Sequence, residues 1–302
     1  MAAKKKTGRI ALPYLITIFL GILIVGGGTY LFLRHLGIIS GSDKLPEPPS
    51  RQITTVTYAD NHTVLFILDE PEQKCSSTFM LMRSVPKDKK LVFIGIPSNT
   101  ISEGFETEND RQPSLKTYYE TYGAGSAVEY AEKVTGVTID RYMKLNSESF
   151  IALCDKIGNV TYSVSEDIQG FDSDGSDMNL TSSQVEKLIL YPLFPDGETE
   201  RAYMVGSIVS AMVNQNAGQR IADNLDNSFN SIVNIADTDI TAVDYRNHKV
   251  AIKNMLTNGR AIASFLILEG EVSGEDFLPS ESFLADLRSE YYSYDEGKGE
   301  AE

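Results

Sequence analysis

The segment "CSSTFMLMRSVPKDKKLVFIGIPSNT", residues 75–100, contains two short apolar runs, each with a polar cluster at one end. The cluster "CSST" begins the segment, and the cluster "PSNT" ends it. Apolar runs of this length, bounded by polar residues or proline, are typical of buried strands in a sheet that is covered on both faces. If the two strands are neighbours, the clusters meet and form a site of small neutral side chains.

Short apolar runs and helical patterns also alternate through the rest of the chain. The expected strands cover residues 64–68, 78–85, 91–96, 139–145, 160–164 and 263–268, and the expected helices cover 126–134, 147–157, 199–216, 220–235, 239–256 and 280–291. Ser126 and Glu129 have the spacing of a capping box at the start of the first helix. The alternation predicts an α/β domain with a mixed central β-sheet flanked by helices on both faces, an α-β-α arrangement.

The N-terminal region has the features of a membrane anchor. Residues 10–33 contain no charged side chain, and as a helix they would extend about 36 Å, enough to cross a bilayer. The apolar region of a cleaved signal peptide, the alternative, is shorter, about 7–15 residues. Lys4, Lys5, Lys6 and Arg9 lie on the short side of this run. By the positive-inside rule the N-terminus is therefore expected in the cytoplasm and the rest of the chain outside the cell membrane.

Charge separates the N-terminus from the remainder of the chain. Residues 1–36 carry basic but no acidic side chains, whereas the whole chain has 27 basic and 42 acidic ones and a net charge of −15. Because an acidic domain repels a polyanion, we expect no nucleic-acid partner. The predicted parts are a cytoplasmic tail (1–9), a transmembrane helix (10–33), a juxtamembrane linker (34–61), one extracytoplasmic domain (62–291) and a polar tail (292–302).

Common catalytic and metal-binding motifs are absent from the sequence. It contains no G-x-S-x-G, P-loop, C-x-x-C or H-E-x-x-H pattern. The acidic stretch 172–177 lacks the spacing of an EF-hand, so a solvated loop is expected there. Of the two cysteines, Cys154 lies on an apolar helical face and is expected to be an inert core thiol, whereas Cys75 lies in the polar cluster.

Three stretches resemble the LytR-CpsA-Psr family. They are "VLFILDEPEQKCSSTFMLMRSVPKDKKLVFIGIPSNT", "KTYYETYGAGSAVEYAEKVTGVTIDRYMKLNSESFIALCDKIGNVTYSV" and "FLPSESFLADLRSEYY", and together the resemblance extends over residues 62–291. It implies a membrane-anchored extracytoplasmic protein of a Gram-positive-type cell envelope. Family members transfer glycopolymers from polyprenyl-pyrophosphate carriers to peptidoglycan. Their arginines hold the pyrophosphate and their aspartates hold Mg²⁺, which together neutralise dense negative charge.

Compared with the family's motifs, this sequence lacks most of these charges. Asp69 matches the first family aspartate, but Cys75 and Ser77 stand where the R-S-D-T motif has Arg and Asp. Ser98 and Asn99 stand where the I-P-R-D-T motif has Arg and Asp.

A later segment of the family also contains arginines. Here "YPL", residues 191–193, replaces the first of them, and "MV", residues 204–205, replaces an Arg-Gln pair. Arg201 is the residue that aligns with a helix arginine. Neutral side chains can bind a ligand by hydrogen bonds, but they cannot replace two aspartate ligands of Mg²⁺ or an arginine on pyrophosphate.

The resemblance therefore implies a cell-wall protein that has lost its phosphotransferase chemistry, a pseudoenzyme that binds a polyprenyl-linked envelope precursor or a partner protein. No catalytic residue and no cofactor are expected. One alternative is an active transferase that uses Mg²⁺ with Asp69 as a possible metal ligand and Arg83 and Arg201 as possible phosphate-binding residues. The other alternative is a structural envelope scaffold that binds no ligand.

Overall fold

The computed structural model describes residues 55–69, 77–105, 112–216, 219–258 and 261–294. All of them belong to one unit, Thr54–Glu302. The predicted anchor, residues 10–33, lies outside the described ranges. Among the helices that are described, none combines the length and apolar character needed to cross a membrane.

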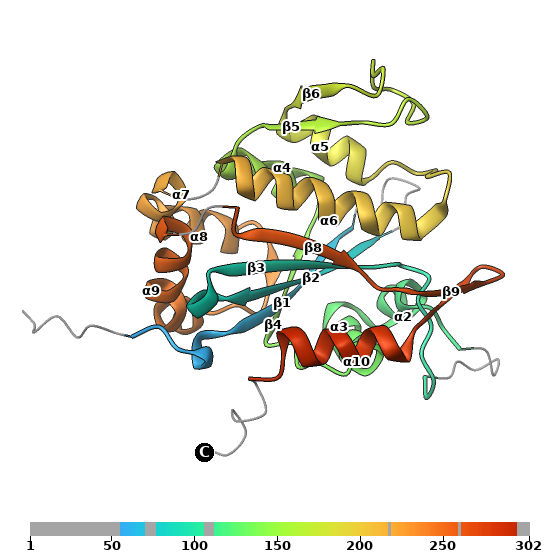
Figure 1. Cartoon of the computed structure of the whole chain (residues 1–302), viewed down its shortest axis with the longest axis horizontal. Coiled ribbons are helices and arrows are strands. Elements are labelled where there is room, and N and C mark those ends of the chain that lie inside the picture. Colours follow the sequence, from blue (N-terminus) through green and yellow to red (C-terminus); the bar gives the residue numbers. More distant parts are fainter. Residues whose placement is uncertain (1–54, 70–76, 106–111, 217–218, 259–260, 295–302) are drawn as a thin grey trace, which may run out of the picture. The chain divides into compact units, whose positions relative to one another are not determined.

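A six-stranded mixed sheet forms the centre of the domain, with the strand order β7-β4-β1-β2-β3-β8 (Figure 1). β1 and β2 pair antiparallel, as do β2 and β3, whereas β4 runs parallel to β1 and β8 runs parallel to β3. The strands are β1 (His62–Leu68), β2 (Thr78–Val85), β3 (Lys90–Ile96), β4 (Arg141–Leu145), β7 (Asp237–Thr238) and β8 (Ala263–Ile267). The predicted mixed central sheet is confirmed.

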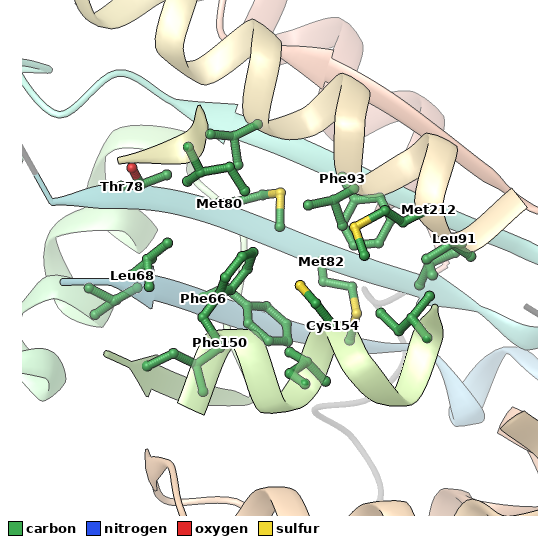
Figure 2. Close-up of a pocket in the computed structure, with 18 residues that line it drawn as sticks. Phe66, Leu68, Thr78, Met80, Met82, Leu91, Phe93, Phe150, Cys154 and Met212 are labelled. Atoms are coloured by element: carbon green, nitrogen blue, oxygen red, sulfur yellow. The ribbon is translucent and has the colours of Figure 1, made fainter. Parts of the chain in front are cut away.

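Successive side chains of the central strands point to opposite faces and enter two separate cores, as the two-residue period of a strand requires. On β1, Leu65 and Ile67 belong to one core, whereas Val64 and Leu68 belong to the other. Figure 2 shows Phe66, Met80 and Met82 on the second face, beside the helix that carries Cys154. The continuous apolar runs of the sequence arise because both faces are covered.

Helices cover each face of the sheet. α2, α3 and α10 contribute to the core on the Leu65 face, and α4, α5, α6, α7 and α9 contribute to the core on the Val64 face. Their bounds are α2 (Leu115–Tyr122), α3 (Ala124–Thr135), α4 (Ser147–Ile157), α5 (Ser182–Ile189), α6 (Gly197–Asn216), α7 (Gln219–Asp223), α8 (Leu225–Val233), α9 (Ala242–Asn258) and α10 (Glu281–Tyr291). The short 3₁₀ helices are η1 (Tyr58–Asp60) and η2 (Pro86–Asp88).

Two local expectations were wrong, and one expected strand is present but lies outside the central sheet. Ser126 does not begin a helix, because Gly123, with φ 87°, already starts α3 at Ala124. The helix expected at 220–235 divides at Asn224, where the backbone is not helical and the chain starts α8. The run at 160–164 is not part of the central sheet, because β5 (Val160–Ser163) pairs with β6 (Asp177–Leu180) in a separate hairpin. A second hairpin joins β9 (Gly270–Ser273) and β10 (Asp276–Pro279).

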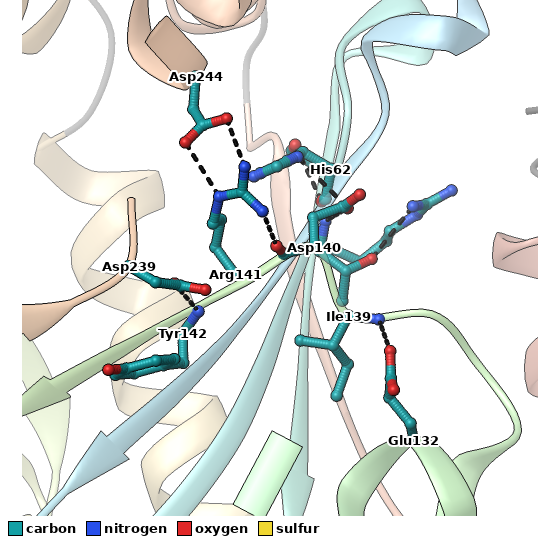
Figure 3. A network of polar contacts seen from close by, with 11 residues as sticks. His62, Glu132, Ile139, Asp140, Arg141, Tyr142, Asp239 and Asp244 are labelled. Carbon is teal, nitrogen blue, oxygen red and sulfur yellow. Dashed lines mark hydrogen bonds and ion pairs between the residues drawn. The ribbon is translucent and has the colours of Figure 1, made fainter. Parts of the chain in front are cut away.

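A charged pair attaches α9 to the edge of the sheet (Figure 3). Arg141 on β4 donates from Nε and Nη2 to the two carboxylate oxygens of Asp244 on α9, at 2.9 and 2.8 Å. Asp239 accepts a hydrogen bond from the backbone N–H of Tyr142 at 2.8 Å. The hydrogen bonds from Arg141 lower the pKa of Asp244 well below its ordinary value. This pair therefore holds α9 over the Val64 face of the sheet.

We predict that Asp244→Asn lowers the free energy of unfolding at neutral pH by about 1 kcal/mol, because the pair is bidentate but the Arg141 side chain is 34% exposed. The pKa of Asp244 is lower in the folded than in the unfolded state, where it is about 3.9. The ionised carboxylate therefore stabilises the fold at pH values above about 3.9, and this stabilisation is lost as the pH falls toward the folded-state pKa. The difference from the wild type should therefore shrink below about pH 4. Urea unfolding at several pH values measures it. Asp286→Asn, an exposed position on α10, is the matched control; an equal loss in both variants would contradict the assignment.

Candidate functional site

The ends of three central strands bring the predicted polar residues to one edge of the sheet. Leu68 pairs with Thr78, and Phe79 pairs with Ile96. Asp69 and Ser77, one residue beyond the first pair, therefore lie next to each other. Continuing the pairing of β2 with β3 by two residues places Ser77 opposite Ser98. We call this the Asp69 edge: Asp69, Ser77, Ser98 and Asn99. Cys75, the remaining predicted position, lies outside the described residues.

Both oxygens of the Asp69 carboxylate accept hydrogen bonds from neutral donors. Ser77 Oγ donates to Oδ1 at 3.1 Å, and the Tyr119 hydroxyl donates to Oδ2 at 2.6 Å. Tyr119 comes from α2 and is 4% exposed. Burial, followed by the hydrogen bond to Asp69, raises the pKa of Tyr119 far above its ordinary value, so the phenol remains a donor. Lys144 Nζ lies 5.6 Å from the centre of the Tyr119 ring and brings one cation near this edge.

At Ser98 the edge is occupied by a carboxylate from the first turn of α6. Ser98 Oγ donates to Glu198 Oε2 at 2.7 Å, and Arg201 Nε donates to the same oxygen at 3.2 Å. Ser98 is 3% exposed and Arg201 is 2% exposed. Three residues from two distant segments thus form a partly buried chain of hydrogen bonds, with the Glu198 side chain 19% exposed. In the family's motif, a positively charged side chain stands at the position that Ser98 occupies here.

The second half of the Arg201 guanidinium binds the C-terminal end of α5. Nη1 donates to the carbonyl oxygen of Ile189 at 2.9 Å, and Nη2 donates to that of Pro192 at 3.5 Å. Carbonyl groups at a helix C-terminus carry partial negative charge. Arg201 therefore lies beside Ser98, but its charge is already balanced by Glu198 and by these carbonyls.

Asn99 connects the edge to the β9–β10 hairpin. Its Nδ2 donates to the carbonyl oxygen of Glu275 at 2.7 Å, and the N–H of Phe277 donates to the Asn99 carbonyl oxygen at 3.1 Å. Its Oδ1 is buried and has no hydrogen-bond partner among the described residues. Asn99 thus serves the fold through its amide nitrogen and leaves one acceptor at the edge.

Arg83 is not at this edge, in contrast to the expectation that it could bind phosphate there. It pairs across the sheet with Thr63, at the opposite end of β1 and β2. Five residues of extended strand separate it from Thr78, which corresponds to about 17 Å. Its side chain is fully buried; Nη1 donates to Thr63 Oγ1 at 3.1 Å, and the guanidinium lies 4.4 Å from the centre of the Tyr292 ring. This arginine belongs to the packing between the sheet and the C-terminal residues.

A polar pocket of about 360 Å³ lies beside Ser98 and Asn99. Lys116 and the acidic residues Glu198, Glu275 and Asp276 are among its lining residues, together with hydroxyl and amide side chains. Carboxylates therefore outnumber cations in this pocket. Such a lining does not favour the binding of a phosphate group.

An apolar cavity of about 160 Å³ begins at the same edge and runs between the sheet and helices α4 and α6 (Figure 2). Leu68 and Thr78, the neighbours of Asp69 and Ser77, line its start. Phe66, Met80, Met82, Leu91, Phe93, Phe150, Cys154, Val209 and Met212 are among the residues that line its length. Burial raises the pKa of the Cys154 thiol to about 12, so it remains a neutral wall residue, as predicted for a core thiol. The cavity suits an apolar ligand that enters at this end of the sheet, beside Leu68 and Thr78.

Sequence reasoning missed Tyr119 and Glu198. Both contact predicted site residues, but they lie 50 and 100 positions away from them in the sequence. Glu198 lies immediately before the helix predicted at 199–216, and an acidic residue at a helix N-terminus suits the helix dipole, so it pointed to no site. Within the part of the chain that the structure describes, no three His, Cys, Asp or Glu side chains lie together in a way that could hold a metal ion.

Comparisons with known proteins agree with the resemblance. The model of the LytR_cpsA_psr family matches residues 41–265. The polyisoprenyl-teichoic acid–peptidoglycan teichoic acid transferase TagU of Bacillus mycoides is 22% identical over 259 residues, which cover 80% of this chain and 84% of TagU. A crystal structure from Eubacterium siraeum, named as that of a transcription regulator, has a TM-score of 0.68 and 20% identity, and covers 83% of this chain and 98% of that chain. Bacillus subtilis TagV has a TM-score of 0.59 and 16% identity, with 76% and 94% covered. These two structures share the fold.

The balance of charge at Arg201 can be tested by Glu198→Gln. The change keeps the shape of the side chain but removes the charge that compensates the guanidinium. We expect inorganic pyrophosphate to bind the variant about fivefold more tightly than the wild type at low ionic strength, a change of about 1 kcal/mol. Isothermal titration calorimetry measures the dissociation constants. Glu275→Gln, which removes a charge from the same pocket at a residue whose side chain does not contact Arg201 among the described residues, is the control. An equal gain in both variants, or none in Glu198→Gln, would contradict this prediction.

Proposed function

The chain belongs to the LytR-CpsA-Psr family, and from this membership we propose that it is a membrane-anchored cell-envelope protein that binds a polyprenyl-linked glycopolymer precursor without transferring it. The observation that carries the proposal is the apolar cavity that starts beside Leu68 and Thr78, directly next to the Asp69 edge. A precursor of this kind has a long apolar chain joined to a polar head. The cavity fits the chain, and the edge receives the head.

The polar part of the edge is poorly suited to phosphoryl transfer. Cleavage of a pyrophosphate bond concentrates negative charge on oxygen atoms, and enzymes stabilise this charge with arginines, lysines or metal ions. Here Ser77, Ser98 and Asn99 are neutral, and Glu198 adds a negative charge beside Ser98. Removing one charge-stabilising donor commonly lowers the rate about 10²–10³-fold. The replacement of several donors supports a function in binding.

A magnesium ion also fits the edge poorly. Mg²⁺ prefers octahedral coordination by oxygen, usually with one or two carboxylates among its ligands. Asp69 is retained, but its two oxygens already accept hydrogen bonds from Ser77 and Tyr119. Ser77 stands where the family's motif has a second carboxylate. The carboxylate of Glu198 is bound to Ser98 and Arg201.

An active transferase remains the second candidate because Asp69 itself is kept in the family position and Lys144 lies near it, over the Tyr119 ring. Such an enzyme would need to free Arg201 from Glu198 before the guanidinium could bind phosphate. A structural scaffold, the third candidate, needs no ligand in the cavity. Both are outcomes of the experiment below.

The proposal includes retention of the N-terminal anchor, with residues 1–9 in the cytoplasm and the family domain outside the membrane. The uncharged run at 10–33 and the basic residues before it support this orientation. A membrane-attached domain would also meet its lipid-linked ligand at the membrane surface. Protease added to intact cells tests the orientation, since it should digest the domain.

We predict that the full chain purifies with a bound polyprenyl or similar long-chain lipid, and that neither EDTA nor high salt releases it. Apolar burial contributes about 25 cal/mol per Å², and this contribution does not depend on charge or metal ions. Native mass spectrometry of the chain released from detergent measures the occupancy. Val209→Trp, which fills the cavity from α6, should remove the lipid, whereas Asp69→Asn should keep it.

Two results would contradict this prediction. A wild-type chain that takes up no long-chain lipid would favour the scaffold. A lipid released by EDTA would show that a metal ion holds its head group, in favour of the active transferase.

A further inference from the structure

A second apolar cavity, of about 260 Å³, lies on the same face of the sheet, under α8 and α9. It is lined by Val64, Met143, Phe229, Ile232, Ile252 and Met255 among others. Its far end is polar, where His62, Ser84 and Asp244 are found. We call the cavity that starts at the Asp69 edge the outer cavity and this one the inner cavity.

The two cavities follow each other along the strands. β1 contributes Phe66 and Leu68 to the outer cavity, and Val64 and His62 to the inner one. Within the described residues, Met82 and Leu91 are the two that line both cavities. Their side chains therefore lie between the two cavities.

The volume of the outer cavity limits what it can hold alone. An apolar cavity of about 150 Å³ accommodates a molecule the size of benzene, and the outer cavity measures about 160 Å³. A long prenyl chain with its head at Asp69 thus needs the inner cavity as well. To reach it, the chain has to pass Met82 and Leu91.

Of these two residues, Met82 is the one suited to act as a gate. Leu91 is buried, with 6% of its surface exposed, whereas Met82 is only partly buried. Methionine is unbranched and has several rotatable bonds, so its side chain can move aside without a shift of the backbone. On the sheet, Met82 lies between its partners Val64 and Phe93, at the middle of the apolar face.

We propose that Met82 determines the length of prenyl chain that this protein binds: the units next to the head group occupy the outer cavity, and the following units pass Met82 into the inner cavity. The inference rests on the proposed function, because it assumes that the outer cavity receives a prenyl chain. The polar end of the inner cavity limits the length of prenyl chain that can be buried. His62 contacts Asp140 there at 3.3 Å, so apolar units that extend to this point gain no further burial.

A series of prenyl phosphates of increasing length tests the role of Met82 in the full chain. Geranyl, farnesyl and geranylgeranyl phosphate differ by one isoprene unit at each step, and their dissociation constants can be measured by native mass spectrometry or by displacement of a fluorescent analogue. For the wild type we expect geranylgeranyl phosphate to bind at least about tenfold more tightly than geranyl phosphate, because the added units are buried in the inner cavity. In Met82→Trp the larger side chain closes the passage, and this preference should fall below about threefold.

Two further variants locate the effect. Ile252→Trp, on α9, fills only the inner cavity and should reproduce the result of Met82→Trp. Val209→Trp fills only the outer cavity and should weaken all three ligands alike. Retained binding of geranyl phosphate shows that the Met82 and Ile252 variants are folded. If circular dichroism shows that Met82→Trp is unfolded, the smaller change Met82→Phe is measured in its place.

The possible failures are distinguishable. If the wild type binds no prenyl phosphate of any length, the proposed function fails, and the inference fails with it. If the wild type prefers longer chains and the Met82 variants keep that preference, the role of Met82 is overturned while the proposed function stands. Equal binding of all three lengths by the wild type would likewise overturn the inference alone.

Discussion

The central sheet has to be covered on both faces, because β1, β2 and β3 carry apolar side chains on both. The Leu65 face is closed by α2, α3 and α10, whose side chains form a continuous core. The Val64 face is covered by a larger set of helices, and cavities remain between them and the sheet. The inner cavity requires α9 to stay in place over the strands. The pair between Arg141 and Asp244 ties this helix to β4. Burial on both faces thus stabilises the sheet, and the cavities lie on the Val64 face, between the sheet and its covering helices.

The edge of the sheet shows a second constraint, the compensation of buried charge. A buried arginine is stable only when its charge is paired and its N–H groups are bonded. Glu198 and the carbonyls at the end of α5 meet both needs of Arg201. The same contacts occupy the groups that would otherwise attract a phosphate. On the other side of the edge, each oxygen of the Asp69 carboxylate accepts one hydrogen bond, from Ser77 and from Tyr119. The proposed role in binding, without transfer, rests on this engagement of Arg201 within the protein.

The sequence alone was sufficient for the main elements of the fold, since apolar runs and helical periods follow directly from burial. It was also sufficient to place Asp69, Ser77, Ser98 and Asn99 at one edge, because neighbouring strands end there. It failed for Arg83, which is close to Ser77 in sequence but is carried to the other end of the sheet by an extended strand. It failed for Glu198 as well, because the contact with Ser98 depends on how α6 packs on the edge. The outcome for Cys75 is open, since this residue lies outside the described ranges.

We propose that this member of the LytR-CpsA-Psr family has an apolar cavity for a lipid chain but lacks the charges for phosphoryl transfer. The most direct test incubates the full chain with a polyprenyl-pyrophosphate-linked glycan and Mg²⁺, and measures binding and cleavage of the pyrophosphate bond in the same sample. We expect the lipid-linked glycan to bind and to remain intact. Magnesium-dependent cleavage by the unmodified chain, abolished by Asp69→Ala, would contradict the account.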